Sequence, residues 1–213
     1  MKLNNDRACK LAEFLLQIKA IKLQPTNPFT WASGWKSPIY CDNRKTLSFP
    51  KVRTYIRQYF SELIREKFGK PDLIAGVATG GIAHGVLVAE ELGLPFVYVR
   101  NTPKTHGLGN QIEGYFEENQ SVVVIEDLIS TGGSSIEAIK ALRESKLNVK
   151  GMAAIFTYGF EESITNFKNA KCKFETLTNY DYLMDQAIRE KYIDESNLES
   201  LIKWRTNPSQ WMK

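Results

Sequence analysis

Residues 122–133 read VVVIEDLISTGG. A run of four aliphatic residues, as expected of a strand buried on both faces, ends in two adjacent acids, Glu126 and Asp127. A short turn rich in hydroxyl groups and glycine follows, and a helical pattern of apolar residues begins near Ser134. A strand, a turn and a helix in this order predict one unit of a parallel α/β sheet, whose ligands bind at the carboxyl ends of the strands.

The same alternation of strand and helix continues on both sides of this stretch. Apolar runs predict strands at 72–78, 95–100, 121–127 and 150–158, and amphipathic patterns predict helices at 5–19, 49–69, 80–93 and 134–145. Residues 20–47 indicate short strands and turns, and residues 160–213 indicate a further helix and strand followed by C-terminal helices. We expect one α/β domain over residues 1–213, with a mostly parallel central sheet flanked by helices and a core at about 50–178.

The turn after the acids has the properties of a phosphate site. Gly132 and Gly133 let the backbone approach a ligand, and a helix start presents free N–H groups and the positive end of a dipole. Ser134 and Glu137 are spaced as a capping box, which predicts that the helix begins there. The sequence therefore predicts a phosphate cradle without a lysine. Its residues are Leu128, Ile129, Ser130, Thr131, Gly132, Gly133 and Ser134.

The two acids narrow the choice of ligand. The chain contains neither the GxxxxGK[ST] pattern of a nucleoside-triphosphate loop nor the GxGxxG pattern of a dinucleotide site. A carboxylate repels a phosphate, so Glu126 and Asp127 make sense if they face neutral hydroxyl groups or a cation. A ribose 5-phosphate offers a phosphate to the turn and two ring hydroxyls to the acids. The plainer interpretation is that the acids cap a helix and the glycines only turn the chain, but the whole combination favours a ligand site.

The composition is that of an ordinary globular protein. Of 213 residues, 43% are apolar and 24% are charged, and the net charge is +4 without a long basic run, so we expect no nucleic-acid partner. The three cysteines are far apart in the sequence, which argues against a zinc site or a disulfide framework. The N-terminus lacks a signal-peptide pattern, and no stretch approaches the roughly 18 apolar residues that span a bilayer. We expect a cytoplasmic protein without a membrane partner.

Three stretches resemble a known family. VVVIEDLISTGGS resembles the phosphoribosyl diphosphate motif of the type I phosphoribosyltransferases, and residues 29–44 (FTWASGWKSPIYCDNR) and 104–114 (KTHGLGNQIEG) are similar to the orotate phosphoribosyltransferases among them. The resemblance covers about residues 10–190. It implies the type I phosphoribosyltransferase fold, with residues 20–47 as a small hood over the base.

The resemblance also implies an activity. A phosphoribosyl group passes from phosphoribosyl diphosphate to orotate, which gives orotidine 5′-phosphate and pyrophosphate in pyrimidine (UMP) biosynthesis. The family requires Mg²⁺. It forms a homodimer in which the loop at positions 101–113 reaches into the partner's site.

Within this resemblance, the motif residues have separate roles. Glu126 and Asp127 match acids that contact the ribose hydroxyls, and Asp127 is one of the implied catalytic residues. Residues 128–134 match the loop that binds the 5-phosphate, and Ser130 also matches a position close to orotate.

The loop that follows the second predicted strand supplies cations. Arg100, Lys104 and His106 match diphosphate-binding positions, and Lys104 and His106 are implied catalytic residues. Cations on a glycine-flanked loop favour a departing pyrophosphate and keep water out. The alternative for Lys104 and His106 is an ordinary solvated loop.

Recognition of the base is less determined. Phe29 could stack on a planar pyrimidine. Arg44, Lys36 or backbone amides could meet the orotate carboxylate, with Arg44 preferred. The alternative is that the aromatic residues of 28–44 only form a small core of their own. Basic residues of one branch of the family are replaced here by Ala32, Gly80, Asn101 and Tyr158, and the sequence resembles another branch that lacks them.

Two further details stay open in the sequence. Residues 79–81 either approach the diphosphate through backbone amides or form a tight turn into a helix. No His cluster supports a metal site made by protein side chains, so Mg²⁺ would be held mainly by substrate oxygens and water. His84, in a predicted helix, is expected to be packed.

Two rival functions share the motif. A purine or xanthine phosphoribosyltransferase would keep the acids and the turn and differ in the hood. A non-catalytic regulator that binds phosphoribosyl diphosphate would keep the phosphate turn and need no loop cations, so the presence of Lys104 and His106 favours the enzyme.

Overall fold

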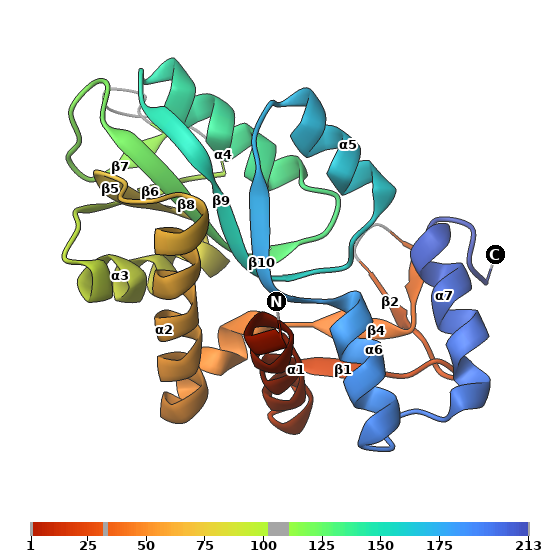
Figure 1. Ribbon diagram of the computed structural model, residues 1–213. Helices are drawn as coiled ribbons and strands as arrows, with labels where there is room; N and C mark the ends of the chain where they lie inside the picture. The colour runs from red at the N-terminus through yellow and green to blue at the C-terminus, as the bar shows by residue number, and fades with distance from the viewer. Residues whose placement is uncertain (1, 32–33, 102–110, 213) are drawn as a thin grey trace.

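The computed structural model describes residues 2–31, 34–101 and 111–212, and a six-stranded sheet forms its centre (Figure 1). The strands of this sheet are β5 (Leu73–Val77), β6 (Phe96–Val99), β7 (Ile112–Glu113), β8 (Ser121–Ile129), β9 (Asn148–Thr157) and β10 (Phe174–Asn179). They lie in the order β10-β9-β8-β5-β6-β7, and all pairs are parallel except the antiparallel pair of β6 and β7. The mostly parallel central sheet expected from the sequence is confirmed.

Helices cover both faces of the sheet. The helices are α1 (Lys2–Gln17), α2 (Pro50–Lys67), α3 (Gly80–Leu92), α4 (Gly133–Glu144), α5 (Glu161–Asn169), α6 (Tyr180–Arg189) and α7 (Leu198–Thr206), with a short 3-10 helix at Glu195–Asn197. α1, α2 and α3 pack on one face, and α4 and α5 pack on the other. Pro50 stands in the first turn of α2, and Gly93, with a φ of 66°, ends α3.

Side-chain alternation along the strands divides the core into two clusters. On β8, Val123 and Ile125 point to the side of α1, α2 and α3, whereas Val122 and Val124 point to the side of α4 and α5. All four side chains are fully buried. Burial on both faces explains the continuous apolar run in the sequence, and it makes β8 a rigid base for the acids and the turn that follow.

The hood, residues 20–47, lies beside the carboxyl end of β8 (Figure 1). Its strands are β1 (Ile21–Leu23), β2 (Phe29–Thr30), β3 (Lys36–Ser37) and β4 (Ile39–Cys41), followed by the 3-10 helix Asn43–Ser48. β1 pairs with β4 and β2 pairs with β3, both antiparallel. Asn43 donates its Nδ2 group to the backbone oxygen of Asp127 at 2.6 Å, which fixes the hood against the strand that carries the acids.

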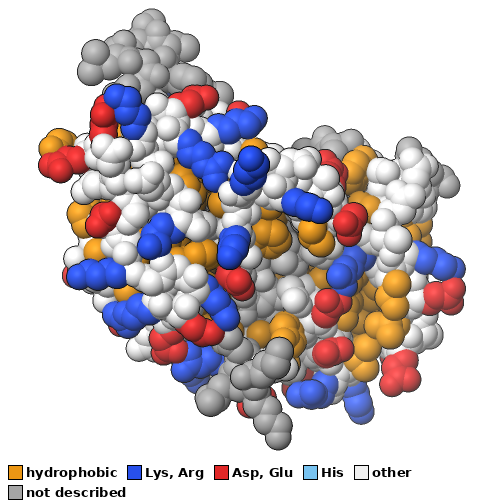
Figure 2. Space-filling view, turned by 45° about the horizontal axis from the view of Figure 1, so that its top comes forward, with side chains coloured by type: hydrophobic (Ala, Val, Ile, Leu, Met, Phe, Trp, Pro, Cys, Tyr) orange, Lys and Arg blue, Asp and Glu red, His pale blue; other side chains and the backbone are white. Residues whose placement is uncertain are grey.

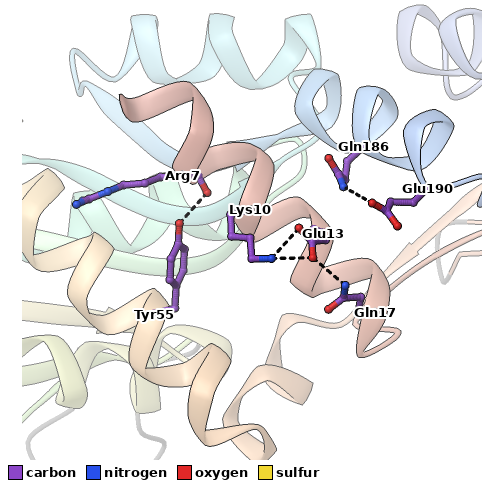
Figure 3. A network of polar contacts seen from close by, with 7 residues as sticks. All are labelled: Arg7, Lys10, Glu13, Gln17, Tyr55, Gln186 and Glu190. Atoms are coloured by element: carbon purple, nitrogen blue, oxygen red, sulfur yellow. Dashed lines mark hydrogen bonds and ion pairs between the residues drawn. The ribbon is translucent and has the colours of Figure 1, made fainter. Parts of the chain in front are cut away.

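α1 lies between α2 and α6 (Figure 3). Tyr55 of α2 donates its hydroxyl to the backbone oxygen of Arg7 at 3.1 Å, and along α1 the Glu13 carboxylate accepts from Lys10 at 2.8 Å and from Gln17 at 2.9 Å. Exposed contacts of this kind contribute little to stability. The apolar side of the helix holds it in place, because its residues are buried; they include Ala8, Leu11, Ala12 and Leu15.

The surface mixes charges of both signs. On the face drawn in Figure 2, a band of Lys and Arg side chains is interleaved with Asp and Glu side chains and with apolar patches. Some of the surface charges are paired, for example Lys146 with Glu118 at 2.8 Å and Lys140 with Glu137 at 2.7 Å. None of the helices in the described ranges is long and apolar enough to cross a membrane.

Candidate active site

The turn between β8 and α4 leaves the first amides of the helix without a side-chain cap. Gly132 is the N-cap residue, with a φ of 85°, and no side chain in the described part of the chain caps the helix. The capping box predicted for Ser134 and Glu137 is therefore wrong, because the helix begins at Gly133 and Ser134 lies inside its first turn. Position 132 requires a positive φ, which glycine adopts and serine rarely does. The uncapped N–H groups are available to an anion.

Two side chains hold this turn from neighbouring elements. Asn166 of α5 donates its Nδ2 group to the backbone oxygen of Thr131 at 2.9 Å. Thr157, at the end of β9, donates its hydroxyl to the backbone oxygen of Ile129 at 3.0 Å. The backbone that would meet a phosphate is therefore positioned by hydrogen bonds from two directions, before any ligand binds.

The acids lie within β8 and not beyond its end. The strand runs to Ile129, two residues past the predicted range of 121–127, because its register with β9 continues through Leu128, which pairs with Phe156. Successive side chains of a strand point to opposite faces. Glu126 consequently lies under the start of α4, and Asp127 lies beside the start of α3.

Burial controls the protonation of this pair. Glu126 is only 4% exposed, and its carboxyl group accepts hydrogen bonds from the Ser135 hydroxyl at 3.4 Å and the Asp127 amide at 3.0 Å. Burial raises the pKa of Glu126 well above its usual range, and the adjacent Asp127 carboxylate raises it further. Burial also raises the pKa of Asp127, although a hydrogen bond with Glu126 and the charge of Arg44 oppose the increase. The carboxyl oxygens of the buried Glu126 and the half-buried Asp127 are suited to accept hydrogen bonds from neutral hydroxyl groups.

α3 begins directly beside Asp127. Thr79 is its N-cap residue, and no side chain caps this helix either within the described ranges. A Cβ atom on Gly80 would lie 2.2 Å from Oδ1 of Asp127, and one on Gly81 would lie 2.3 Å from the backbone oxygen of Ile125. The sequence left open a tight turn or a backbone binding site here. The structure shows the tight turn, and its uncapped amides are free to serve as a second anion site.

Two uncapped helix starts thus flank one pair of acids. α3 follows β5 and α4 follows β8, and these two strands are neighbours in the sheet, so both helix starts stand side by side at its carboxyl edge. Each start carries a partial positive charge that favours an anion by about 0.3–1 kcal/mol. The arrangement suits a ligand with an anionic group at each end and neutral hydroxyl groups between them.

A buried polar chain connects the hood with this site. Thr46 donates its hydroxyl to the backbone oxygen of Asn43 at 2.5 Å and lies 3.1 Å from Nε2 of His84 on α3. Asn43 in turn holds the backbone of Asp127. Burial lowers the pKa of His84 to about 4, so this histidine is neutral at pH 7 and is packed, as we expected. The chain positions Asp127 relative to both the hood and α3.

Arg100 shares a cavity with the start of α4. The cavity has a volume of about 240 Å³ and is lined by Val77, Val99, Arg100, Asn101, Gln111, Ser134, Glu137 and Ala138. The Arg100 guanidinium lies 3.6 Å from the Glu113 carboxylate, and the Arg100 backbone oxygen accepts from Nε2 of Gln111 at 2.8 Å. The structure therefore brings Arg100 and Ser134 together. Lys104 and His106, predicted for the same site, lie outside the described residues.

A second cavity joins the hood to the turn. Its volume is about 280 Å³, and its lining residues are Thr30, Trp31, Tyr40, Cys41, Leu128, Ser130 and Tyr158. Aromatic walls with a hydroxyl group at one end suit a planar, polar ring. Ser130 belongs to this cavity as well as to the turn, which places the two candidate subsites next to each other.

The other two residues predicted for the base lie at the edge of this arrangement. The Phe29 ring packs against Tyr40, with 5.6 Å between the ring centroids, and it is not part of the cavity lining. Arg44 is exposed, and its Nε group lies 2.7 Å from a carboxylate oxygen of Asp42. The Asp127 carboxylate also acts on the charge of Arg44, so Arg44 is close enough to influence the site.

Sequence reasoning missed the contribution of α7. Trp204 is fully buried and packs edge-on against Trp31 and Tyr158, with centroid distances of 5.8 and 5.6 Å. Trp31 and Tyr158 also contact each other at 5.5 Å, and both line the hood cavity. No local pattern connects position 204 with position 31, so only the folded chain reveals that the C-terminal helix supports the cavity wall.

Two further observations limit the site. A larger cavity, about 640 Å³, lies between α6 and α7, but its lining includes no residue of the acid pair or the turn. Among the described residues, no group of three or more His, Cys, Asp or Glu side chains could hold a metal ion. The chemistry therefore concentrates at the carboxyl ends of β5 and β8.

Comparisons with known proteins identify the family of this chain. The model of the phosphoribosyl transferase domain family matches residues 47–176. An orotate phosphoribosyltransferase of Phocaeicola vulgatus is 60% identical over 200 residues, 94% of each chain, and one of Listeria monocytogenes is 53% identical over 204 residues, 96% of this chain and 98% of its own. The crystal structure of orotate phosphoribosyltransferase from Aeropyrum pernix, at 24% identity, has a TM-score of 0.72 and covers 86% of this chain and 99% of that one, which bears on the fold alone.

The matched range contains the acid pair, the phosphate turn and both uncapped helix starts, and the relatives align with this chain over nearly its whole length. The resemblance carried by residues 122–134 is thereby confirmed. The chain belongs to the phosphoribosyltransferase family and, within it, to the orotate phosphoribosyltransferases.

Proposed function

We propose that this protein transfers the phosphoribosyl group of phosphoribosyl diphosphate to orotate, releasing pyrophosphate and forming orotidine 5′-phosphate for pyrimidine synthesis. The observation that carries the proposal is the pair of uncapped helix starts on either side of Glu126 and Asp127. Phosphoribosyl diphosphate has a monophosphate at one end, a diphosphate at the other and two ring hydroxyls between them. The order of its charged and hydroxyl groups therefore matches the order of the site: a helix start, the acid pair and a second helix start.

In this proposal, the turn at positions 130–134 binds the 5-phosphate. The free amides of α4 and the hydroxyl groups of the turn donate to its oxygens. Glu126 and Asp127 accept hydrogen bonds from the ribose hydroxyls. Their negative charge also favours the positive charge that develops on the ribose ring as the bond to the diphosphate breaks.

The diphosphate then occupies the side of α3. The uncapped amides at the start of α3 would stabilise its charge as it departs. The resemblance adds Arg100, which lies in the cavity beside the start of α4 and would reach the diphosphate from that side. Lys104 and His106 complete this set in the proposal and exclude water from the reacting carbon.

Mg²⁺ fits this site as a companion of the substrate. Because the described residues form no protein-only metal cluster, the diphosphate oxygens and water would supply most of its ligands. When bound, the ion neutralises part of the diphosphate charge and so improves the leaving group.

The hood cavity is the proposed site of the base. Its aromatic walls exclude water and hold the pyrimidine in plane, while Ser130 lies between base and phosphate. Phe29 supports this wall through Tyr40. The sequence suggests Arg44 or Lys36 as the partner of the orotate carboxylate. We further propose that the enzyme is a cytoplasmic homodimer whose loop 101–113 serves the partner's site.

One assay tests the proposal. Purified protein is mixed with orotate, phosphoribosyl diphosphate and Mg²⁺, and loss of orotate and release of pyrophosphate are followed together. We expect both in equal amounts, and neither when the sugar diphosphate or the metal ion is omitted. Pyrophosphate release with hypoxanthine, xanthine or adenine but not with orotate would assign the purine alternative. Binding of the sugar diphosphate without turnover of any base would assign the regulator.

A further inference from the structure

The hood cavity contains no charged side chain among its lining residues. Thr30, Trp31, Tyr40, Cys41, Leu128, Ser130 and Tyr158 are all neutral types, and burial raises the pKa values of Cys41 and Tyr158 well above their usual range. Orotate carries a carboxylate at neutral pH. A carboxylate that leaves water for such a cavity requires a cation or several hydrogen-bond donors at the rim.

Lys36 supplies a cation at this rim. It lies on β3 directly opposite Thr30 of β2, so both side chains project from the same face of the two-stranded ribbon. The Lys36 ammonium donates to the Thr30 hydroxyl at 2.9 Å, and Thr30 lines the cavity. An ammonium group has three donors, and this contact uses one of them. The remaining donors are available to a ligand.

Arg44, the other candidate, already uses one of its five N–H donors on an acid beside it. Its Nε group forms an ion pair with Asp42 at 2.7 Å, and this hydrogen bond raises the pKa of Arg44 and lowers the pKa of Asp42. After Asp42, the acidic groups in range of Arg44 are Asp127 and then Tyr40, and the larger effect of Asp127 places the Arg44 charge toward the ribose end of the site. Neither Arg44 nor Lys36 lines the cavity itself, but Lys36 is hydrogen-bonded to Thr30, which does.

We propose that Lys36, held at the rim of the hood cavity by Thr30, binds the carboxylate of the base and makes the enzyme specific for a carboxylated pyrimidine. The inference rests on the proposed function and names the residue that sets its substrate class. Loss of Lys36 should weaken the binding of ligands that carry the carboxylate and leave the affinity for ligands without it unchanged.

Two nucleotides separate this effect from general damage. Orotidine 5′-phosphate and uridine 5′-phosphate share the ribose and the 5-phosphate and differ only in the carboxylate. Dissociation constants for both nucleotides are measured by calorimetry. Where direct binding is too weak to measure, the constant is obtained from a competition experiment. Lys36→Met, which keeps the length of the apolar stem, should weaken orotidine 5′-phosphate about 10- to 100-fold, as expected for a charge-assisted hydrogen bond. Uridine 5′-phosphate and phosphoribosyl diphosphate should change by less than about twofold.

Three variants complete the design. Lys36→Arg should restore most of the affinity, Lys22→Met removes an exposed lysine from β1 of the same hood and should change nothing, and Arg44→Met should weaken both nucleotides equally. The inference is overturned if Lys36→Met affects both nucleotides alike or neither, or if the selective loss belongs to Arg44→Met. Failure of the wild-type protein to consume orotate would instead overturn the proposed function, so the two failures are distinguishable.

Discussion

Replacing Gly80 with alanine should disable the site while leaving the fold intact. The added Cβ would lie 2.2 Å from Oδ1 and 2.3 Å from Cγ of Asp127, whereas ordinary contact begins at 3.4 Å. The carboxylate must therefore move by about 1.2 Å, the difference between 3.4 and 2.2 Å. It can do so, because it is the end of a side chain. A displacement of about 1 Å at a reacting centre typically lowers the rate by about 100-fold.

The prediction is measured by two independent quantities. The ratio kcat/KM for phosphoribosyl diphosphate, at saturating orotate, should fall about 100-fold in Gly80→Ala. The melting temperature should change by less than about 2 °C, since a shift of about 1 kcal/mol corresponds to about 2–4 °C in a chain of this size.

Two neighbouring glycines are matched controls. A Cβ on Gly81 would lie 2.3 Å from the backbone oxygen of Ile125, which cannot turn away, so Gly81→Ala should lower the free energy of unfolding by about 1–3 kcal/mol. A Cβ on Gly133 meets nothing within 4 Å, so Gly133→Ala should keep or raise stability by up to about 1 kcal/mol. Wild-type kcat/KM in Gly80→Ala, or equal destabilisation by Gly80→Ala and Gly81→Ala, would refute the reasoning.

Further predictions concern the buried histidine, the C-terminal helix and the dimer. His84 has a pKa of about 4 in the folded state and about 6.5 when unfolded, so the unfolded state binds more protons between these pH values. The free energy of unfolding should therefore fall by up to about 3 kcal/mol as the pH drops from 6.5 to 4. In urea unfolding measured over this pH range, His84→Gln should show a smaller dependence on pH. Trp204→Phe should raise the KM for orotate several-fold through the loosened Trp31 wall and leave the KM for phosphoribosyl diphosphate unchanged; equal increases in both would contradict the link. Lys104→Ala and Asp127→Asn should each be inactive alone. If the loop crosses a dimer, mixing the two variants should recover up to about one quarter of the wild-type activity, because one site in each mixed dimer is then intact. No recovery in a mixture shown to exchange subunits would remove the crossing loop from the proposal.

The sequence predicts the sheet, its flanking helices and the location of the site, because these depend on local patterns. The apolar run at 122–125 and the glycine that ends α3 both act within a few residues of themselves. The start of α4 is predicted incorrectly for the same reason. Ser134 and Glu137 match a capping box locally, but the positive φ at Gly132 moves the helix start one residue earlier.

Features that depend on distant residues are not accessible in this way. β8 extends past Asp127 because β9 continues to pair with it, which the local sequence alone would not suggest. The hood cavity combines residues from positions 30 to 158 and is supported by Trp204. The preference for Lys36 over Arg44 likewise requires knowing that Asp42 already pairs with the arginine and that Thr30 lies opposite the lysine.

The position of Trp204 also has a consequence for biosynthesis. Ser134, the last residue of the phosphate turn, precedes Trp204 by 70 residues in the chain. At about 5–20 residues per second, a ribosome needs roughly 4–14 s to add this segment. Thr157 and Asn166, which hold the proposed phosphate turn, are also added before Trp204, so the support of the hood cavity is the last of these parts to be synthesised.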